Sequence, residues 1–113
     1  MKTIIAGGRE IHDYDLVLEA ISDANIDITT VVSGGAKGVD SLGEQYAEAM
    51  NIPLHVYKAD WERHGRAAGP IRNRKMAENA DALIAVWDGK SRGTKNMIET
   101  AKKLGLLVFV KLV

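Results

Sequence analysis

The sequence predicts an α/β protein: an open, parallel, three-layer sheet of about five strands with helices on both faces. Two observations support this prediction. Short apolar segments alternate with amphipathic segments along the whole chain, which gives the order βαβαβαβαβ. Most of the strand segments are nearly continuous apolar runs, which is typical of strands that helices cover on both faces. The length of 113 residues fits a single domain over residues 1–113.

The first half of the chain supplies two strands and two helices. Residues 3–6 (TIIA) form the first predicted strand, and residues 29–33 (TTVVS) form the second. Between them, residues 13–24 predict a helix with Asp13 as its N-cap, because apolar residues recur there at helical spacing. Residues 38–50 predict a second helix from the same periodicity.

The second half supplies three more strands and two more helices. Residues 70–79 predict a helix with Pro70 in its first position, where a missing N–H costs nothing. Residues 94–104 predict another helix, capped by Thr94 and ended by Gly105. The remaining predicted strands are the segments 53–58, 82–87 and 106–111.

This alternation predicts a Rossmann-like sheet with the strand order 3-2-1-4-5. Such sheets bind ligands beyond the carboxyl ends of the strands, at the point where the strand order reverses. Here that point lies between the first and the fourth strand. The residues that follow the strands are therefore the candidates for a functional site.

The composition excludes several classes of function. The chain has no cysteine, which removes disulfides, zinc–thiolate sites and cysteine nucleophiles. Its formal net charge is zero, whereas proteins that bind nucleic-acid polymers usually carry a large basic excess. No apolar run is long enough for a membrane span or a secretory signal, so we expect a cytoplasmic protein without a membrane partner. His12 and His55 have no partner at metal-ligand spacing, so we expect no metal site, and we expect no cofactor.

Candidate site residues, most of them small or polar, follow the first four predicted strands. They are Gly7, Gly8 and Arg9 after the first strand, Ser33, Gly34, Gly35, Ala36, Gly38 and Asp40 after the second, Asp60 and Trp61 after the third, and Asp88, Gly89, Ser91, Gly93 and Thr94 after the fourth. Glycine lets backbone N–H groups approach a ligand, and helix N-termini attract anions, so these loops predict a cradle for phosphate or pyrophosphate. Alternatively, short turns before helices need glycine for their geometry alone. Three such loops on one edge favour the ligand.

The predicted helix at residues 70–79 begins with cations, which oppose the helix dipole at that end. A bound anion would relieve this opposition. Arg72 offers phosphate a bidentate fork, and Asn73 can bind a base or sugar edge. A solvated basic face is the alternative. The patterns G-x-x-x-x-G-K-[ST] and G-x-G-x-x-G are both absent, which disfavours a kinase-like P-loop and an NAD-dependent dehydrogenase.

One tryptophan and three aspartates complete the candidate set. Trp61 either stacks on a nucleobase or covers the edge of the sheet. Asp40 either bonds ribose hydroxyls or complements the dipole of the second predicted helix. Asp40, Asp60 and Asp88 are also the candidate catalytic carboxylates, although Asp88 is equally suited to a turn before Gly89.

Taken in order, these loops resemble the YspA-like branch of the SLOG superfamily. The matching segments span nearly the whole chain and include Gly7-Gly8-Arg9, Ser33-Gly34-Gly35-Ala36, Gly38-Val39-Asp40, Asp60-Trp61, Ala68-Gly69-Pro70-Ile71-Arg72-Asn73 and Ser91-Arg92-Gly93-Thr94. The resemblance implies a Rossmann-like fold that binds nucleotides or nucleotide-derived ligands. It carries the family's binding residues over to Gly8, Arg9, Gly34, Gly35, Asp40, Arg72, Asn73, Ser91, Gly93 and Thr94.

The resemblance implies two functions, because related proteins differ. Some cleave the bond between a base and ribose 5′-phosphate with the motif P-G-G-x-G-T-x-x-E. This chain keeps Gly93-Thr94, but Met97 replaces the glutamate, and Glu99 lies about 200° around the helix from it. Other relatives sense nucleotide signals in conflicts between bacteria and phages.

The first hypothesis is therefore a module that binds a phosphorylated, ADP-ribose-like nucleotide derivative. It would act as a sensor, or as a sponge that sequesters a signalling nucleotide. The alternative is a nucleoside 5′-monophosphate phosphoribohydrolase, an N-glycosidic hydrolase. A third hypothesis is a purely structural subunit. We also expect a homo-oligomer, the commonest assembly of small proteins.

Overall fold

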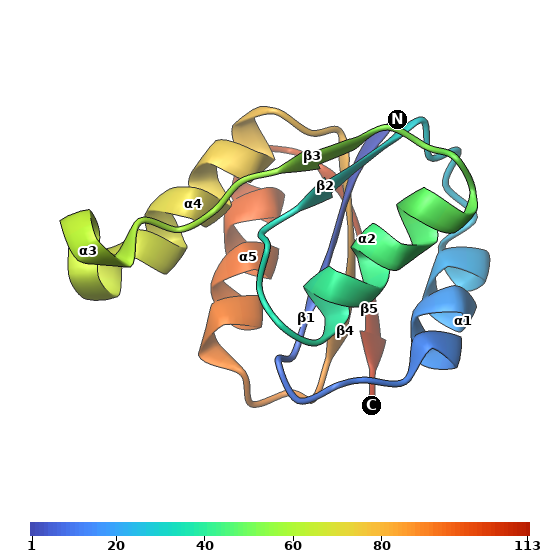
Figure 1. Cartoon of the computed structure of the whole chain (residues 1–113), viewed down its shortest axis with the longest axis horizontal. Helices are drawn as coiled ribbons and strands as arrows, with labels where there is room; N and C mark the ends of the chain where they lie inside the picture. Colours follow the sequence, from blue (N-terminus) through green and yellow to red (C-terminus); the bar gives the residue numbers. More distant parts are fainter.

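The computed structural model describes residues 1–113 and contains one five-stranded sheet (Figure 1). All four strand pairs are parallel, and the strand order is β3-β2-β1-β4-β5. The strands are β1 (Lys2–Gly7), β2 (Thr30–Ser33), β3 (Leu54–Val56), β4 (Ala82–Trp87) and β5 (Leu107–Leu112). The predicted α/β class, the parallel sheet and the order 3-2-1-4-5 are thereby confirmed.

Helices cover both faces of the sheet, as Figure 1 shows. On one face lie α1 (Tyr14–Ala24) and α2 (Val39–Ala49), and on the other lie α4 (Ala68–Glu78) and α5 (Arg92–Lys103). A short helix α3 (Trp61–His64) and a 3₁₀ turn η1 (Gly65–Ala67) precede α4 and project from the body of the molecule. No helix is long and apolar enough to cross a membrane.

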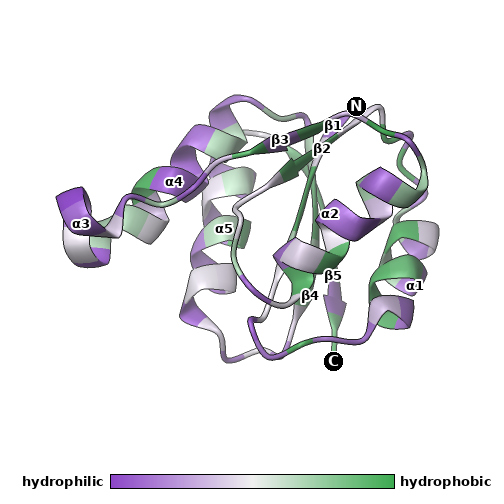
Figure 2. Cartoon of the chain, viewed as in Figure 1, coloured by the Kyte–Doolittle hydropathy of each residue, from purple (hydrophilic) through white to green (hydrophobic).

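The core consists of two apolar clusters, one on each face of the sheet. Successive side chains of a strand point to opposite faces, so neighbours in sequence belong to different clusters. Ile4 and Leu83 pack with α4 and α5, whereas Ile5 and Ile84 pack with α1 and α2. The two central strands, β1 and β4, supply much of both clusters and are coloured green in Figure 2. Burial on both faces explains their continuous apolar sequences.

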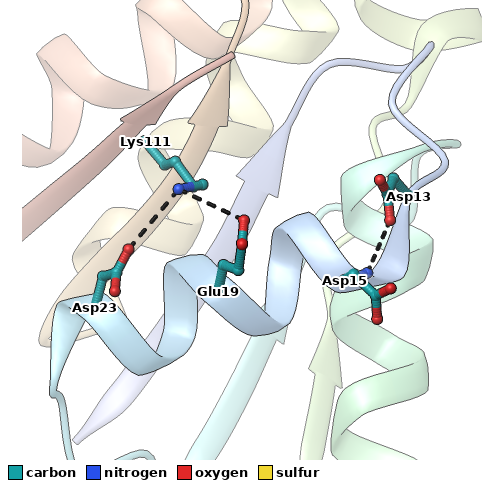
Figure 3. A network of polar contacts seen from close by, with 5 residues as sticks. All are labelled: Asp13, Asp15, Glu19, Asp23 and Lys111. Carbon is teal, nitrogen blue, oxygen red and sulfur yellow. Dashed lines mark hydrogen bonds and ion pairs between the residues drawn. The ribbon is translucent and has the colours of Figure 1, made fainter.

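Polar contacts on the exposed side of helix α1 cap its N-terminus and join the helix to β5 (Figure 3). The carboxylate of Asp13 accepts a hydrogen bond from the Asp15 amide at 3.0 Å, which confirms Asp13 as the N-cap. The Lys111 ammonium on β5 lies 3.7 Å from the carboxylates of both Glu19 and Asp23. These partly exposed ion pairs join α1 to the edge strand and contribute a few tenths of a kcal/mol each, on the order of other surface pairs.

Two helix starts differ from the prediction. Helix α4 begins at Ala68, so Pro70 is its third residue rather than its first. Proline is tolerated there because the first N–H groups of a helix have no intrahelical acceptor. Helix α5 begins at Arg92, and its N-cap is Ser91, not Thr94. The Thr94 amide instead donates to the Ser91 Oγ at 3.5 Å.

The region around β3 also differs from the prediction. The third strand has three residues instead of the six of the segment 53–58, and each is exposed because β3 forms the edge of the sheet. The predicted loop that begins at Asp60 contains α3 and η1. The Asp60 carboxylate accepts a hydrogen bond from the Arg63 amide at 3.1 Å and caps α3. A four-residue helix is too short to show a periodic apolar pattern, which explains why the sequence did not indicate it.

Candidate functional site

A cleft of about 530 Å³ opens beyond the carboxyl ends of β1 and β4. The loops that follow these strands form two of its walls, and α4 with the projecting α3 forms a third. This is the point at which the strand order reverses, where ligands bind in open parallel sheets. The cleft brings together many of the predicted site residues: Gly7, Gly8, Arg9, Ala36, Asp40, Trp61, Arg72, Asn73, Asp88, Ser91, Gly93 and Thr94.

Other predicted site residues lie outside the lining of the cleft, namely Ser33, Gly34, Gly35, Gly38, Asp60 and Gly89. Ser33 shapes the loop after β2: its hydroxyl donates to Glu44 Oε2 at 2.6 Å and accepts from the Gly35 amide at 3.1 Å. Asp60 caps α3, and Gly89 occupies a turn with φ +80°. The structure thus gives these three residues roles in holding the loops.

At two positions of the loops, close packing against another part of the chain explains why the residue is glycine. A Cβ on Gly7 would overlap the carbonyl oxygen of Val86 and lie 2.7 Å from Cγ2 of Val39. A Cβ on Gly38 would overlap the carbonyl oxygen of Gly8, and Gly38 has φ +74°. The Val39 amide also donates to the Gly8 carbonyl at 3.2 Å. The loop after β1 therefore sits directly on the start of α2, and side chains would separate them.

Several backbone amides of the expected phosphate cradle already donate hydrogen bonds to acceptors within the protein. The Gly8 amide donates to the carbonyl oxygen of Val86 at 3.3 Å, and the Gly35 amide donates to the hydroxyl of Ser33. The Ala36 amide donates to the Asp40 carboxylate at 3.3 Å. At the start of α2, a carboxylate of the protein thus lies where a bound anion was expected.

Asp40 is a buried acid, 5% exposed, and it lines the cleft. Burial raises the pKa of the Asp40 carboxyl above its usual 3.8, and the negative charge of Glu44 acts in the same direction. The hydrogen bond from Ala36 and the positive charge of Arg72 lower this pKa but do not cancel the effect of burial. A buried carboxyl of this kind can accept a hydrogen bond from a hydroxyl or, when protonated, donate one.

Arg72 is held beside this carboxyl by two hydrogen bonds. Its Nη1 donates to the Gly34 carbonyl at 2.6 Å, and its Nε donates to Asn73 Oδ1 at 2.9 Å. Burial lowers the pKa of the guanidinium, and the nearby charge of Asp40 opposes that effect. Gly34 has no side chain for a steric reason: a Cβ there would lie 2.7 Å from both Arg72 Nη1 and Asp40 Oδ2.

The loop after β4 is fixed by side chains at both ends. Asp88 Oδ1 accepts hydrogen bonds from the amides of Lys90 and Ser91, each at 2.8 Å, and these bonds lower the pKa of Asp88. The indole N–H of Trp87 donates to the Ser91 carbonyl at 3.0 Å. One oxygen of Asp88 therefore serves the turn before α5, as the turn interpretation expected. The loop places the first turn of α5 at the cleft.

Trp61 belongs to neither apolar cluster and is 51% exposed. It lines the cleft from the projecting helix α3, opposite the loop after β1. The Arg9 guanidinium carbon lies 5.9 Å from the centroid of its indole ring, within the range of a cation–π contact. The interpretation of Trp61 as a cover for the sheet is therefore wrong, and its ring is accessible from the cleft.

Four arginines and no lysine line the cleft, although the chain has fewer arginines than lysines. They are Arg9, Arg66, Arg72 and Arg92. The acids of the lining are Glu10, Asp40 and Asp88, one of them buried with a raised pKa. A protein with zero net charge thus concentrates guanidinium groups, the side chains best suited to bidentate contacts with phosphate or carboxylate, in one cleft.

Ten residues of the lining were not among the candidate site residues from the sequence: Ala6, Glu10, Ile11, Arg66, Gly69, Pro70, Met76, Arg92, Asn96 and Met97. Helical spacing is a signal that could have found some of them. Gly69 and Met76 lie one turn to either side of Arg72 and Asn73 on α4, and Asn96 lies one turn after Gly93 on α5. Arg66 is one of the cations at or just before the start of the predicted helix, but its place in the lining depends on the unexpected η1 turn.

Met97 occupies the position of the glutamate in the hydrolase motif. It is 1% exposed and belongs to the core, and it also reaches the lining of the cleft. Glu99 is exposed and does not line the cleft. The structure therefore places a thioether, not a carboxylate, at this point of α5.

A parallel sheet of this order defines a Rossmann-like protein, and its arginine-lined cleft lies where such proteins bind ligands. Residues 1–64 match the family described as "YspA, cpYpsA-related SLOG family". The chain belongs to this family, and the membership supports a nucleotide-ligand-binding domain.

Two relatives come from phages or prophages. The chain is 34% identical to "Gene 61 protein" of Mycobacterium phage D29, over 95% of this chain and 93% of the relative. It is 37% identical to "Uncharacterized SPbeta prophage-derived protein YoqJ" of Bacillus subtilis (strain 168), over 50% of this chain and 35% of that protein. The match thus spans about a third of the length of YoqJ. No solved structure matches the chain significantly.

Proposed function

We propose that the cleft binds a phosphorylated nucleoside derivative of the ADP-ribose type. The observation that carries the proposal is the partly buried guanidinium of Arg72, held by two hydrogen bonds in a cleft lined by four arginines and no lysine. Burial of a guanidinium costs free energy, which a bound anion offsets. Membership of the SLOG family supports a nucleotide as the ligand that carries this anion.

The lining assigns a part of the ligand to each wall. Arg72 and Arg9 would neutralise phosphate, with help from the open amides in the first turn of α5, since the first N–H groups of a helix lack intrahelical acceptors. Asp40 would accept hydrogen bonds from sugar hydroxyls. The exposed indole of Trp61 would stack on the base, an interaction that tolerates any base because each has a π-face.

We infer that this binding serves signalling: the domain acts as a sensor subunit, or as a sponge that sequesters a signalling nucleotide in conflicts between bacteria and phages. The similarity to a protein of Mycobacterium phage D29 over most of both chains supports a role connected with phages. The buried Met97 supports sequestration rather than cleavage, because the hydrolase glutamate is absent.

Isothermal titration of the protein with linear ADP-ribose, cyclic ADP-ribose and AMP tests the proposal. We expect at least one of them to bind, and Arg72→Ala to weaken that binding by about 10- to 100-fold, the usual range for a charged hydrogen-bond partner. Arg74→Ala is the matched control, since Arg74 lies on the same helix but is exposed and pairs with Glu78 at 3.4 Å. Absence of heat with all three nucleotides would refute the proposal.

The phosphoribohydrolase remains the second candidate because of one observation, the buried acid Asp40 in the cleft. An acid with a raised pKa is suited to protonate a leaving group. Incubation with AMP, followed by chromatography for free adenine, separates the candidates. Turnover that disappears in Asp40→Asn would establish the hydrolase, whereas AMP recovered intact from a tight complex establishes the binding module.

A further inference from the structure

Asn73 uses all of its side-chain hydrogen-bonding groups inside the protein. It is 4% exposed. Its Oδ1 accepts a hydrogen bond from Arg72 Nε at 2.9 Å. Its Nδ2 donates to Asn96 Oδ1 at 2.9 Å and to the Gly93 carbonyl at 3.3 Å. Both N–H groups of the amide are therefore engaged, and no donor is left for a base or a sugar.

The partners of Asn73 belong to the two walls of the cleft that carry positive charge. Arg72 is on α4, whereas Gly93 and Asn96 are in the first turns of α5. The amide of Asn73 thus connects the guanidinium on α4 to the start of α5. These two elements pack against each other in the core on the same face of the sheet, which keeps the connection short.

This connection fixes the orientation of the Arg72 guanidinium. Asn73 Oδ1 holds Nε, and the Gly34 carbonyl, from the loop after β2, holds Nη1. Two anchors from different elements define the plane of the group. A guanidinium offers bidentate contacts either through Nε and Nη2 or through Nη1 and Nη2. Asn73 takes the single N–H of Nε and Gly34 takes one N–H of Nη1, so the free donors are the second N–H of Nη1 and both N–H groups of Nη2.

We propose that Asn73 is a positioning residue for anion recognition: it holds Arg72 so that the N–H groups of Nη1 and Nη2 that remain free meet the oxygens of one anionic group. The identity of that group as phosphate rests on the proposed function, whereas the anchoring of Arg72 does not. Asn73 then contributes to affinity through Arg72 and does not touch the ligand. An aspartate would be a poor substitute, because it would present a carboxylate oxygen to the Gly93 carbonyl and would neutralise Arg72.

The anchoring is tested without any ligand by ¹⁵N relaxation of the Arg72 Nε–Hε group. In the wild-type protein we expect an order parameter of about 0.85, like that of a rigid backbone. In Asn73→Ala we expect a value below about 0.6, because Nε loses its acceptor. Asn79→Ala is the matched control: Asn79 caps the end of the same helix, about two turns after Arg72, and donates to the Lys75 carbonyl at 2.8 Å.

A second variant covers the case that Asn73→Ala does not fold. Asn96→Ala removes one partner of Asn73 Nδ2 and leaves the contact with Nε in place, so we expect an intermediate order parameter. An Nε–Hε group that is mobile in the wild type, or equally rigid in both variants, would overturn the proposal.

A double-mutant cycle with ADP-ribose then separates positioning from a merely structural role. We expect Asn73→Ala to weaken binding by about three- to tenfold in the wild-type background, the cost of ordering one long side chain. In the Arg72→Ala background we expect no further loss, because Asn73 acts only through Arg72. Equal losses in both backgrounds would overturn the proposal. If the wild type binds no nucleotide, the proposed function fails, and the relaxation experiment alone decides the role of Asn73.

Discussion

The substitution Gly38→Ala separates two explanations of a glycine-rich loop: packing of the chain against itself, or close approach of a ligand. Gly38 has φ +74° and ψ −129°, and a residue with a side chain adopts such a conformation at a cost of about 1–3 kcal/mol. The new Cβ would also overlap the carbonyl oxygen of Gly8 and lie 2.6 Å from that of Arg9. Overpacking of this kind costs about 1–3 kcal/mol more. We therefore expect the free energy of unfolding to fall by about 2–6 kcal/mol in the absence of ligand.

Gly105→Ala is the matched control for this prediction. Gly105 has a similar φ of +79°, but a Cβ there meets no atom within 4 Å, so only the backbone cost of about 1–3 kcal/mol applies. Urea unfolding followed by tryptophan fluorescence measures both variants, and the difference between them isolates the contact with Gly8. If Gly38→Ala is no less stable than Gly105→Ala, the packing explanation is wrong.

Three further substitutions test the cleft and the loop after β4. Gly93→Ala should leave the free energy of unfolding unchanged or raise it by about 0.4–1 kcal/mol, because the new Cβ meets no atom within 4 Å. Calorimetry should nevertheless show weaker ADP-ribose binding, because Gly93 lines the cleft and the added methyl group enters it. Trp87→Phe should lower the free energy of unfolding by about 0.5–1.5 kcal/mol through loss of the hydrogen bond to Ser91, and an unchanged urea midpoint would contradict this role. Asp40→Asn tests the effect of burial on pKa: the folded protein holds the Asp40 proton more tightly than the unfolded chain, so this stabilisation is complete below pH 3.8 and is lost as the pH rises through the raised pKa. The wild type should therefore lose stability relative to Asp40→Asn across that range, and urea unfolding in a pH series that shows the opposite slope would refute the argument.

The sequence predicted the sheet well because strands that are buried on both faces have nearly continuous apolar sequences. Residues 82–87 are predicted and observed as the same strand, since this central strand is covered on both sides. The edge strand β3 is exposed and shorter than predicted. An apolar segment at the edge of a sheet does not need to pair with its neighbouring strand over its whole length. Helix α3 was missed because one capping aspartate, Asp60, and four residues give no periodicity.

The site was predicted less completely, for a different physical reason. Residues at the ends of strands could be assigned to one edge of the sheet from topology alone, and the cleft does collect Gly8, Arg9 and Gly93. Topology does not tell which loop residue faces a ligand and which one faces another loop. Ser33 donates a hydrogen bond to Glu44, and Gly38 packs against Gly8. Both contacts depend on how neighbouring segments of the chain pack together.

Because several loop amides donate hydrogen bonds within the protein, fewer donors remain for the phosphate of the proposed ligand. The Asp40 carboxylate accepts the Ala36 amide at the start of α2, so a phosphate there would meet a negative charge instead of free donors. The anionic part of the ligand is therefore expected between Arg72 and the first turn of α5, with the sugar hydroxyls toward Asp40. The two orientations give opposite results for ADP-ribose binding to Asp40→Asn at neutral pH. Loss of the charged acceptor weakens binding if hydroxyls face Asp40, whereas loss of repulsion strengthens it if phosphate does. Tighter binding by Asp40→Asn would thus place the phosphate beside Asp40 and refute this orientation.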